Sequence, residues 1–187
     1  MEGERGDNTR WMDLASAGDT AAFGEVARHV QDGLFRFARA HGLGPADAAD
    51  ATQETLLRAY RRRSSWRLGS DVSSWLYGIA MNVVRETWRR RRHAAPAGFS
   101  AACLAAPPAD DDGPTPDELA RLGACVAALP ARQREAVACR FLRRMSVRQT
   151  ATVMGCAEGT VKAAVFAAMK NLRSAMRAET PSTMERA

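Results

Sequence analysis

A segment rich in proline and glycine divides the chain and limits what it can fold into. Residues 94–116 contain five prolines, two glycines and the acidic run Asp110–Asp112. Proline and glycine oppose regular secondary structure, and the like charges resist collapse. The chain has 187 residues, enough for one domain or two small ones. We therefore expect domains at residues 11–93 and 115–178, a flexible acidic linker at 94–114 and a disordered tail at 179–187.

Apolar residues recur at helical spacing on both sides of this segment. In the stretch from Thr20 to Ala40, for example, Phe23, Val26 and Val30 fall on one helix face. Alanine dominates the apolar residues and there is a single isoleucine, which favours helix over sheet. The predicted fold class is all-α, with two small helical domains. We expect helices over about residues 20–40, 46–63, 72–88, 116–128, 131–144, 147–154 and 158–177.

The second domain contains the strongest local motif, a helix-turn-helix. Ser146 opens a capping box, and the small Ala151 suits the point where two helices cross. Gly155 suits a turn that requires positive φ. A second capping box begins at Thr115, and Asp71 is placed to cap a helix in the first domain. In such a motif the N-terminal residues of the second helix face base edges in the major groove. The apolar residues predicted to hold the motif together are Met154, Cys156, Val161 and Val165.

Charge is sorted along the chain. The net charge is −4 over residues 1–60, +7 over 61–93, −5 over 94–120 and +8 over 121–187. Basic blocks indicate contacts with a polyanion such as nucleic acid, and an acidic block indicates a protein contact. Charge runs also occur on solvated faces, so the sorting alone leaves that alternative open.

Several classes of protein are disfavoured. No apolar run approaches the ~18–20 residues that span a bilayer, and the N-terminus lacks the order of a signal peptide. We therefore expect a cytoplasmic protein without membrane insertion. The four cysteines form no CxxC pair and the three histidines are scattered, so no metal site is expected. No phosphate-binding loop or nucleophile constellation is present, and we expect neither an enzyme nor a cofactor.

The ordered set of motifs resembles one family. The stretch Leu129–Val137, then Ser146, then Gly159–Lys162 resembles region four of bacterial extracytoplasmic-function (ECF) sigma factors of the sigma-70 family. Residues Gly18–Phe23 are similar to the family's opening helix. Asp47–Tyr60 resembles its helix for binding core polymerase, and Ser74–Asn82 resembles its promoter-melting helix.

This resemblance implies a dissociable subunit of RNA polymerase that directs promoter-specific initiation. The implied partners are core RNA polymerase, promoter DNA and an anti-sigma factor, and the free protein is expected to be a monomer. The implied polymerase-binding residues are Asp47, Asp50, Gln53, Glu54 and Arg58. Those implied for the minus-ten element are Trp66, Ser74, Trp75, Tyr77, Asn82, Arg85 and Arg89. Those implied for helix-turn-helix contacts with the minus-thirty-five element are Arg148, Gln149, Glu158, Gly159, Thr160, Lys162, Ala163, Phe166 and Lys170.

Two departures from the family pattern keep alternatives open. Alanines occupy much of residues 163–169, where the family usually has arginine, and Ala51-Thr52 replaces a commoner apolar pair. The alternative function is a degenerate sigma-like regulator that binds polymerase or an anti-sigma partner without initiating transcription. A third is a two-domain helix-turn-helix repressor, which has no reason to carry the first-domain motifs.

Overall fold

The computed structural model describes residues 2–91 and 115–178, and all the regular structure in these ranges is helical. This confirms the all-α fold class. The predictions for the linker at 94–114 and the tail at 179–187 lie outside the described residues. The first group of helices is α1 (Glu2–Ser16), α2 (Thr20–Ala40), α3 (Pro45–Arg61), the short 3₁₀ helix η1 (Arg63–Ser65) and α4 (Val72–Arg90). The second is α5 (Pro116–Ala128), α6 (Ala131–Val137), the π-helical turn η3 (Ala138–Leu142), α7 (Val147–Met154) and α8 (Glu158–Ala178).

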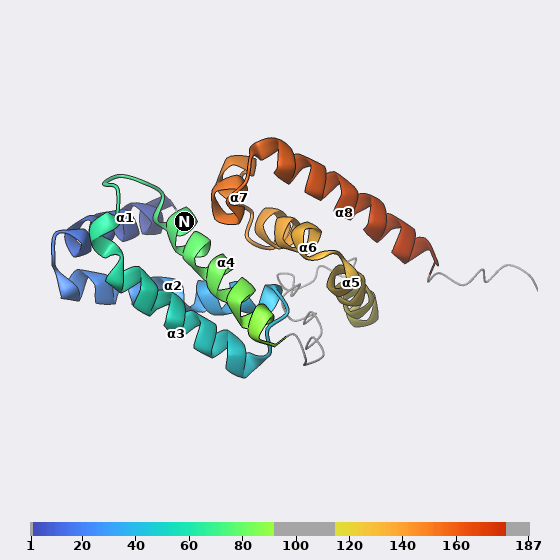
Figure 1. Cartoon of the computed structure of the whole chain (residues 1–187), viewed down its shortest axis with the longest axis horizontal. Coiled ribbons are helices and arrows are strands. Elements are labelled where there is room, and N and C mark those ends of the chain that lie inside the picture. The colour runs from blue at the N-terminus through green and yellow to red at the C-terminus, as the bar shows by residue number, and fades with distance from the viewer. Residues whose placement is uncertain (1, 92–114, 179–187) are drawn as a thin grey trace, which may run out of the picture.

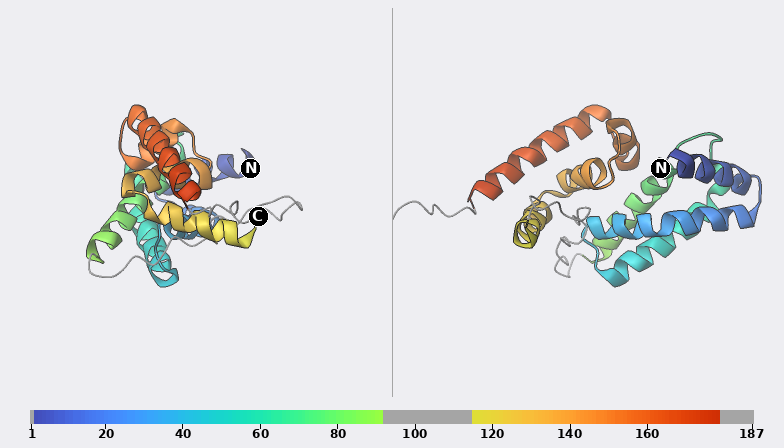
Figure 2. Two further views of the ribbon diagram at one scale, coloured as in Figure 1. Left: turned by 90° about the vertical axis from the view of Figure 1, so that its right-hand side faces the viewer. Right: turned by 180° about the vertical axis from the view of Figure 1, so that it is seen from behind.

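Figure 1 shows the two groups as separate helical domains that meet where α7 lies against α4. In the right-hand view of Figure 2, the C-terminal end of α8 extends away from the first domain. The hydrophobic core continues across the contact, because Met154 and Val153 of α7 are buried in the same cluster as Ile79 and Val83 of α4. The sequence predicted two domains but gave no sign that they pack together.

The predicted helix caps are confirmed. The Asp71 side chain accepts a hydrogen bond from the Ser73 amide at the start of α4. Thr115 and Ser146 each form a capping box, with Glu118 and Gln149 as the respective partners. Such caps satisfy amide groups that have no partner within the first turn of a helix. They account for where α4, α5 and α7 begin.

Two stretches differ from the sequence-based expectation. Helix α1 was not predicted; it packs on the first domain through Met12 and Ala15, which are fully buried. The single helix expected over residues 131–144 is α-helical only to Val137 and continues as the π-helical turn η3. Beyond that turn Arg144 has φ 50°, a left-handed conformation that helical periodicity cannot reveal. The Arg143 guanidinium, directly after this turn, lies over the Tyr77 ring, 4.7 Å from its centre.

Candidate functional site

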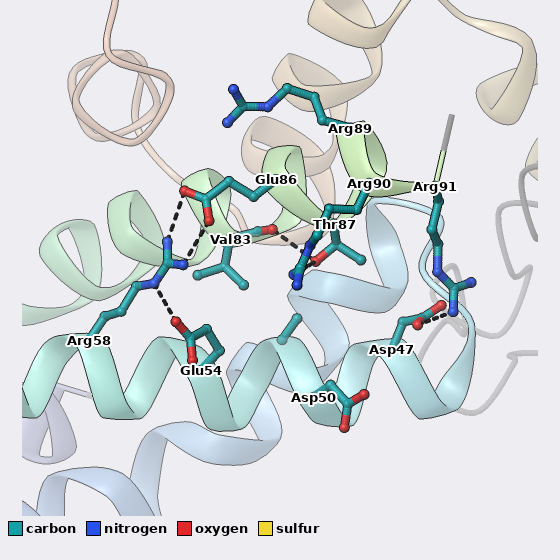
Figure 3. A pocket seen from close by; sticks show the side chains of 11 residues that line it. Asp47, Asp50, Glu54, Arg58, Val83, Glu86, Thr87, Arg89, Arg90 and Arg91 are labelled. Carbon is teal, nitrogen blue, oxygen red and sulfur yellow. Dashed lines mark hydrogen bonds and ion pairs between the residues drawn. The ribbon is translucent and has the colours of Figure 1, made fainter. Parts of the chain in front are cut away.

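A charged groove runs between α3 and α4 (Figure 3). Arg58 lies across it: its Nε donates to Glu54 Oε1 at 2.7 Å, and its two terminal nitrogens donate to the Glu86 carboxylate at 2.9 and 2.7 Å. The hydrogen bonds to Glu86 and Glu54 raise the pKa of the Arg58 guanidinium, and the bond from Arg58 lowers the pKa of Glu86. At the other end of the groove Arg91 forms an ion pair with Asp47.

The five predicted polymerase-binding residues therefore divide into two sets. Asp47, Glu54 and Arg58 take part in ion pairs along the groove. Asp50 and Gln53 are exposed on α3, and Figure 3 shows Asp50 pointing away from α4. Among the described residues, Asp50 has no ion pair within 4.0 Å. The exposed part of α3 is thus acidic and amide-bearing, and the first domain itself does not neutralise it.

The loop after η1 holds Trp66, which the family resemblance assigns to the minus-ten element. Its side chain is only 7% exposed. The indole Nε1 donates to Asp13 Oδ1 at 2.7 Å, and the ring stacks edge-to-face on Trp75 with a centroid separation of 5.5 Å. A different residue, Leu68, occupies the exposed part of this loop, with 73% of its surface accessible. Trp66 thus anchors the loop in this arrangement, and its role toward DNA stays a prediction.

Three of the predicted minus-ten residues of α4 lie at the contact with the second domain. Ser74 is buried and donates to Asp71 Oδ2 at 2.6 Å. Tyr77 is also buried and accepts a hydrogen bond from Arg143. Arg85 forms a forked ion pair with Glu135 of α6, at 2.9 and 2.8 Å. By contrast, Asn82 and Arg89 are exposed.

The charged groups at this domain contact stabilise one another's ionised forms. Burial raises the pKa of the Glu135 carboxyl, but the hydrogen bonds and charge of Arg85 outweigh it, so that the pKa is lowered. The bond to Glu135 also raises the pKa of Arg85. Gln149 of α7 donates to Asp71 Oδ2 at 2.7 Å, a second polar contact between the domains. We call this packing of α4 against α6 and α7 the closed arrangement. In it, Arg85 and Gln149 bind partners in the other domain, although the family resemblance assigned both to DNA.

The helix-turn-helix has the predicted geometry. Gly155 ends α7 with φ 64° and ψ 47°, and the Cys156 amide donates to the Ala151 carbonyl at 3.0 Å. Met154 and Val161 are buried, with Cys156 and Val165 packed against the same core. Gly155 therefore provides the left-handed turn that lets α8 leave α7 at an angle.

The first turns of α8 are open to solvent, as a recognition helix requires. Phe166 is 75% exposed, a large apolar side chain on a solvent-facing part of the helix. Gln149 is the one predicted residue of this set engaged elsewhere, in its capping box and with Asp71. The other predicted residues of this set are exposed, namely Arg148, Glu158, Gly159, Thr160, Lys162, Ala163, Phe166 and Lys170.

Sequence reasoning missed four polar residues that shape these surfaces: Asp13, Glu86, Glu135 and Arg143. Their partners lie 53, 28, 50 and 66 residues away along the chain. Local spacing carries no information about such pairs. Glu135 stands within the stretch that resembles region four, but nothing in that stretch points to a partner in the first domain.

Within residues 2–91 and 115–178, no group of three or more histidine, cysteine or acidic side chains is placed to hold a metal ion. In the same ranges, no helix is long and apolar enough to cross a membrane.

Comparison with known proteins places both domains in one class, that of the sigma-70 proteins. The family described as Sigma-70 region 2 matches residues 26–94, and the family described as Sigma-70, region 4 matches residues 119–172. Among solved structures, CnrH in complex with the cytosolic domain of CnrY has the same fold, with a TM-score of 0.72 at 22% identity over 93% of this chain and 99% of that one.

Sequence relatives show which group of sigma-70 proteins the chain resembles. The chain is 35% identical to the ECF RNA polymerase sigma factor SigM of Mycobacterium tuberculosis, over 78% of this chain and 72% of SigM. It is 33% identical to the ECF sigma factor SigF of Caulobacter vibrioides, over 86% of this chain and 88% of SigF. The chain belongs to the ECF sigma factors of the sigma-70 family, which act in transcription initiation. This membership removes the alternative of an ordinary helix-turn-helix repressor.

Proposed function

We propose that this sigma factor binds core RNA polymerase through α3, opens the minus-ten element with residues 11–93 and contacts the minus-thirty-five element with residues 115–178. The observation that carries the proposal is the exposed face of α3, where Asp50 and Gln53 lie open to solvent within the match to region 2. An exposed carboxylate and amide suit a basic protein surface, and complementary charge speeds and orients such an encounter.

The test of polymerase binding is the variant Asp50→Arg. Because Asp50 has no ion pair among the described residues, reversing its charge changes the surface without breaking a contact within the domain. Glu54 is less suitable because it holds Arg58. The matched control is Asp32→Arg, which makes the same change at an exposed position of α2. We expect Asp50→Arg to lose co-purification with core polymerase while its helical circular dichroism and the control stay unchanged. Retained co-purification would overturn the assignment of α3.

For the minus-ten element, the proposal requires the two domains to separate. Ser74 and Tyr77 are buried and Arg85 is paired with Glu135 of the second domain, so these side chains are not free to contact DNA in the closed arrangement. Unstacking a base costs a few kcal/mol, and cationic and aromatic side chains recover part of that cost. Asn82 and Arg89 are already exposed and are positioned for first contact. Phosphate contacts from Arg89 would position the duplex without specifying sequence.

For the minus-thirty-five element, the proposal rests on the open first turns of α8. Thr160 and Lys162 are exposed there, beside the helix N-terminus. A helix N-terminus attracts phosphate because its amide groups carry partial positive charge. The net charge of +8 over residues 121–187 adds a general attraction to the duplex.

Run-off transcription separates this proposal from the degenerate-regulator alternative. Purified protein and core polymerase are combined on genomic promoter fragments. Discrete transcripts that depend on this chain support the sigma factor function. Binding to core polymerase without transcripts on any fragment would favour the alternative, for which the alanine-rich stretch at residues 163–169 is the supporting feature.

We also propose that an anti-sigma protein binds this chain, and that the free chain is a monomer. The support is a relative: the sigma factor RpoE was solved in complex with the anti-sigma factor NepR from Bartonella quintana, and it matches with a TM-score of 0.64 at 25% identity over 84% of this chain. Sedimentation of the free protein tests the monomer. A purified candidate partner must form a stable complex with this chain and suppress the run-off transcript.

A further inference from the structure

Helix α1 supplies a carboxylate to the loop that follows η1. Asp13 Oδ1 accepts from Trp66 Nε1 at 2.7 Å and lies 3.4 Å from the amide nitrogen of Gly69. One oxygen therefore contacts the first residue of the short loop between η1 and α4 and a second residue three positions later. Gly69 has φ 72°, a conformation that residues other than glycine rarely adopt. In Figure 1 this loop lies beside α1.

The contact has the features of a fixed anchor. Trp66 is 7% exposed, and a buried indole N–H needs an acceptor, which Asp13 provides. A carboxylate acceptor makes a stronger bond than a neutral one. The Trp66 ring is further held by its edge-to-face contact with Trp75 on α4. The position of the loop is thus set by α1 on one side and by α4 on the other.

The other side of the loop faces solvent. Arg67 is exposed and Leu68 is 73% exposed. Exposure of an apolar side chain as large as that of Leu68 to water is unfavourable. A cation beside an apolar surface is a combination that can hold an unstacked base. The loop thus presents Arg67 and Leu68 to solvent, while Trp66 is buried and the exposed Gly69 is tied to α1 through its backbone amide.

We propose that Asp13 is a positioning residue for base readout: by holding Trp66 and Gly69 it fixes the loop that presents Arg67 and Leu68 to an unpaired base of the minus-ten element. The inference rests on the proposed melting function of the first domain. It adds to that function a residue outside the match to Sigma-70 region 2, which begins at residue 26, and in a helix that the sequence did not predict.

The test compares variants that remove the two partners of the hydrogen bond. Asp13→Ala removes the acceptor, Asp13→Asn keeps an oxygen acceptor without the charge, and Trp66→Phe keeps a ring without the N–H. The matched control is Asp7→Ala, which removes an exposed aspartate from the same helix. Each variant is assembled with core polymerase on a promoter that the wild type opens. The promoter is used both as duplex and with the minus-ten element already unpaired by mismatches.

The readout is base discrimination on templates with single-base changes in the minus-ten element. It is scored on duplex promoters by permanganate reactivity of unpaired thymines and on the mismatched promoters by the affinity of the assembled polymerase. We expect Asp13→Ala and Trp66→Phe to lose roughly tenfold of discrimination at one position on both template forms, the scale of one stacked base. Asp13→Asn is expected to retain most of the discrimination. A double variant that combines Asp13→Ala with Trp66→Phe should lose no more discrimination than either single variant, because both remove the same hydrogen bond. A role limited to stability would instead lower open-complex yield on all templates equally and leave the ratios unchanged.

The outcomes separate a failure of promoter opening from a failure of the Asp13 assignment. If the wild type opens no promoter, the proposed function fails. If the wild type opens promoters and Asp13→Ala keeps full discrimination, the positioning role is wrong. If Asp13→Ala does not fold by circular dichroism, Asp13→Asn and Trp66→Phe decide: unchanged ratios in Trp66→Phe overturn the inference.

Discussion

Arg85 of α4 and Glu135 of α6 form a forked ion pair between the two domains, with nitrogen–oxygen distances of 2.9 and 2.8 Å. The Glu135 side chain is 11% exposed and the Arg85 side chain 30%. Arg132 also approaches the Glu135 carboxylate, at 3.3 Å, and both arginines reach the carbonyl of Met154. One carboxylate thus connects α4, α6 and the end of α7.

Removing Glu135 is expected to open the molecule. In Glu135→Ala, Arg85 would be left partly buried without its carboxylate, and breaking a buried pair by deleting one partner costs about 3–5 kcal/mol; the partial exposure of Arg85 places the cost at or below the lower end. We expect a larger radius of gyration in small-angle X-ray scattering and tighter binding of minus-ten single-stranded DNA. Because Glu25 pairs with Arg28 on the surface, Glu25→Ala is the control, with an expected cost below about 1 kcal/mol. An unchanged radius of gyration in Glu135→Ala would show that the apolar contact alone holds the domains together.

Helical periodicity and cap chemistry were sufficient to predict most helices, because both are local. The capping boxes at Thr115 and Ser146 and the left-handed turn at Gly155 formed as expected. Helix α1 was not predicted because its N-terminal half is charged and its apolar residues are few. Its sequence therefore shows only weak amphipathicity. Its stability comes from packing against α2, which no window of its own sequence contains.

For the candidate site residues, the sequence patterns predicted which helices carry them but not how their side chains pair. The solvent-open residues of α8 followed from the helix-turn-helix pattern. The burial of Trp66 did not, since its acceptor is 53 residues away. The occupation of Arg85 by Glu135 depends on how two domains dock, and charge counts over each segment cannot specify a partner.

Acid is expected to destabilise the fold, first through His41. This ring is fully buried; Nδ1 donates to the Phe37 carbonyl at 2.7 Å, and Nε2 has no partner among the described residues. Burial lowers the pKa of His41 from 6.5 to about 4, with smaller contributions from Phe37, Glu135, Arg134 and Arg85. Between these two pH values, His41 therefore binds a proton in the unfolded chain but stays neutral in the folded chain. The free energy of unfolding should fall as the pH drops from 6.5 toward 4, by roughly 3 kcal/mol in total.

Urea unfolding at a series of pH values measures this slope. His41→Leu should flatten it between pH 6.5 and 4.5, where the lowered pKa of Glu135 keeps that carboxylate ionised in the fold. Below that window the stabilisation from Glu135 is also lost, because its carboxyl is protonated as the pH falls through its folded pKa. The control His29→Leu changes an exposed histidine and should leave the slope intact. A slope that persists in His41→Leu would assign the effect to other groups.

Arg58 is expected to be a modest contributor to stability despite its three hydrogen bonds. Its side chain is 26% exposed, and the carboxylates of Glu54 and Glu86 are 38% and 35% exposed, so water screens the network. Arg58→Lys cannot reproduce the forked contact with Glu86. We expect it to lower the free energy of unfolding by about 1 kcal/mol or less, measured by urea titration at neutral pH. A loss several times larger would mean that the groove is a structural centre of the first domain.

The recognition helix α8 is expected to bind DNA mainly through phosphates. Residues 163–169 contain no arginine, the side chain that most often reads guanine through two hydrogen bonds. Lys162 is exposed but offers a point charge in place of a planar fork. Lys162→Ala should therefore weaken binding to all sequences alike and reduce the slope of log affinity against log salt by about 1. The control Arg28→Ala removes a cation from the surface of α2 and should leave that slope unchanged.

Phe166 is the one large side chain on this stretch that can report on sequence. It is 75% exposed, and an apolar group in the major groove can contact a thymine methyl. Phe166→Ala should therefore lose affinity at one thymine-containing position and leave the salt slope unchanged. Across the remaining minus-thirty-five positions, single-base changes scored with holoenzyme should each cost less than about 1.4 kcal/mol, a tenfold effect. Larger losses at several positions would show that Glu158 and Thr160, exposed at the helix start, read bases directly and that the alanine-rich stretch does not limit specificity.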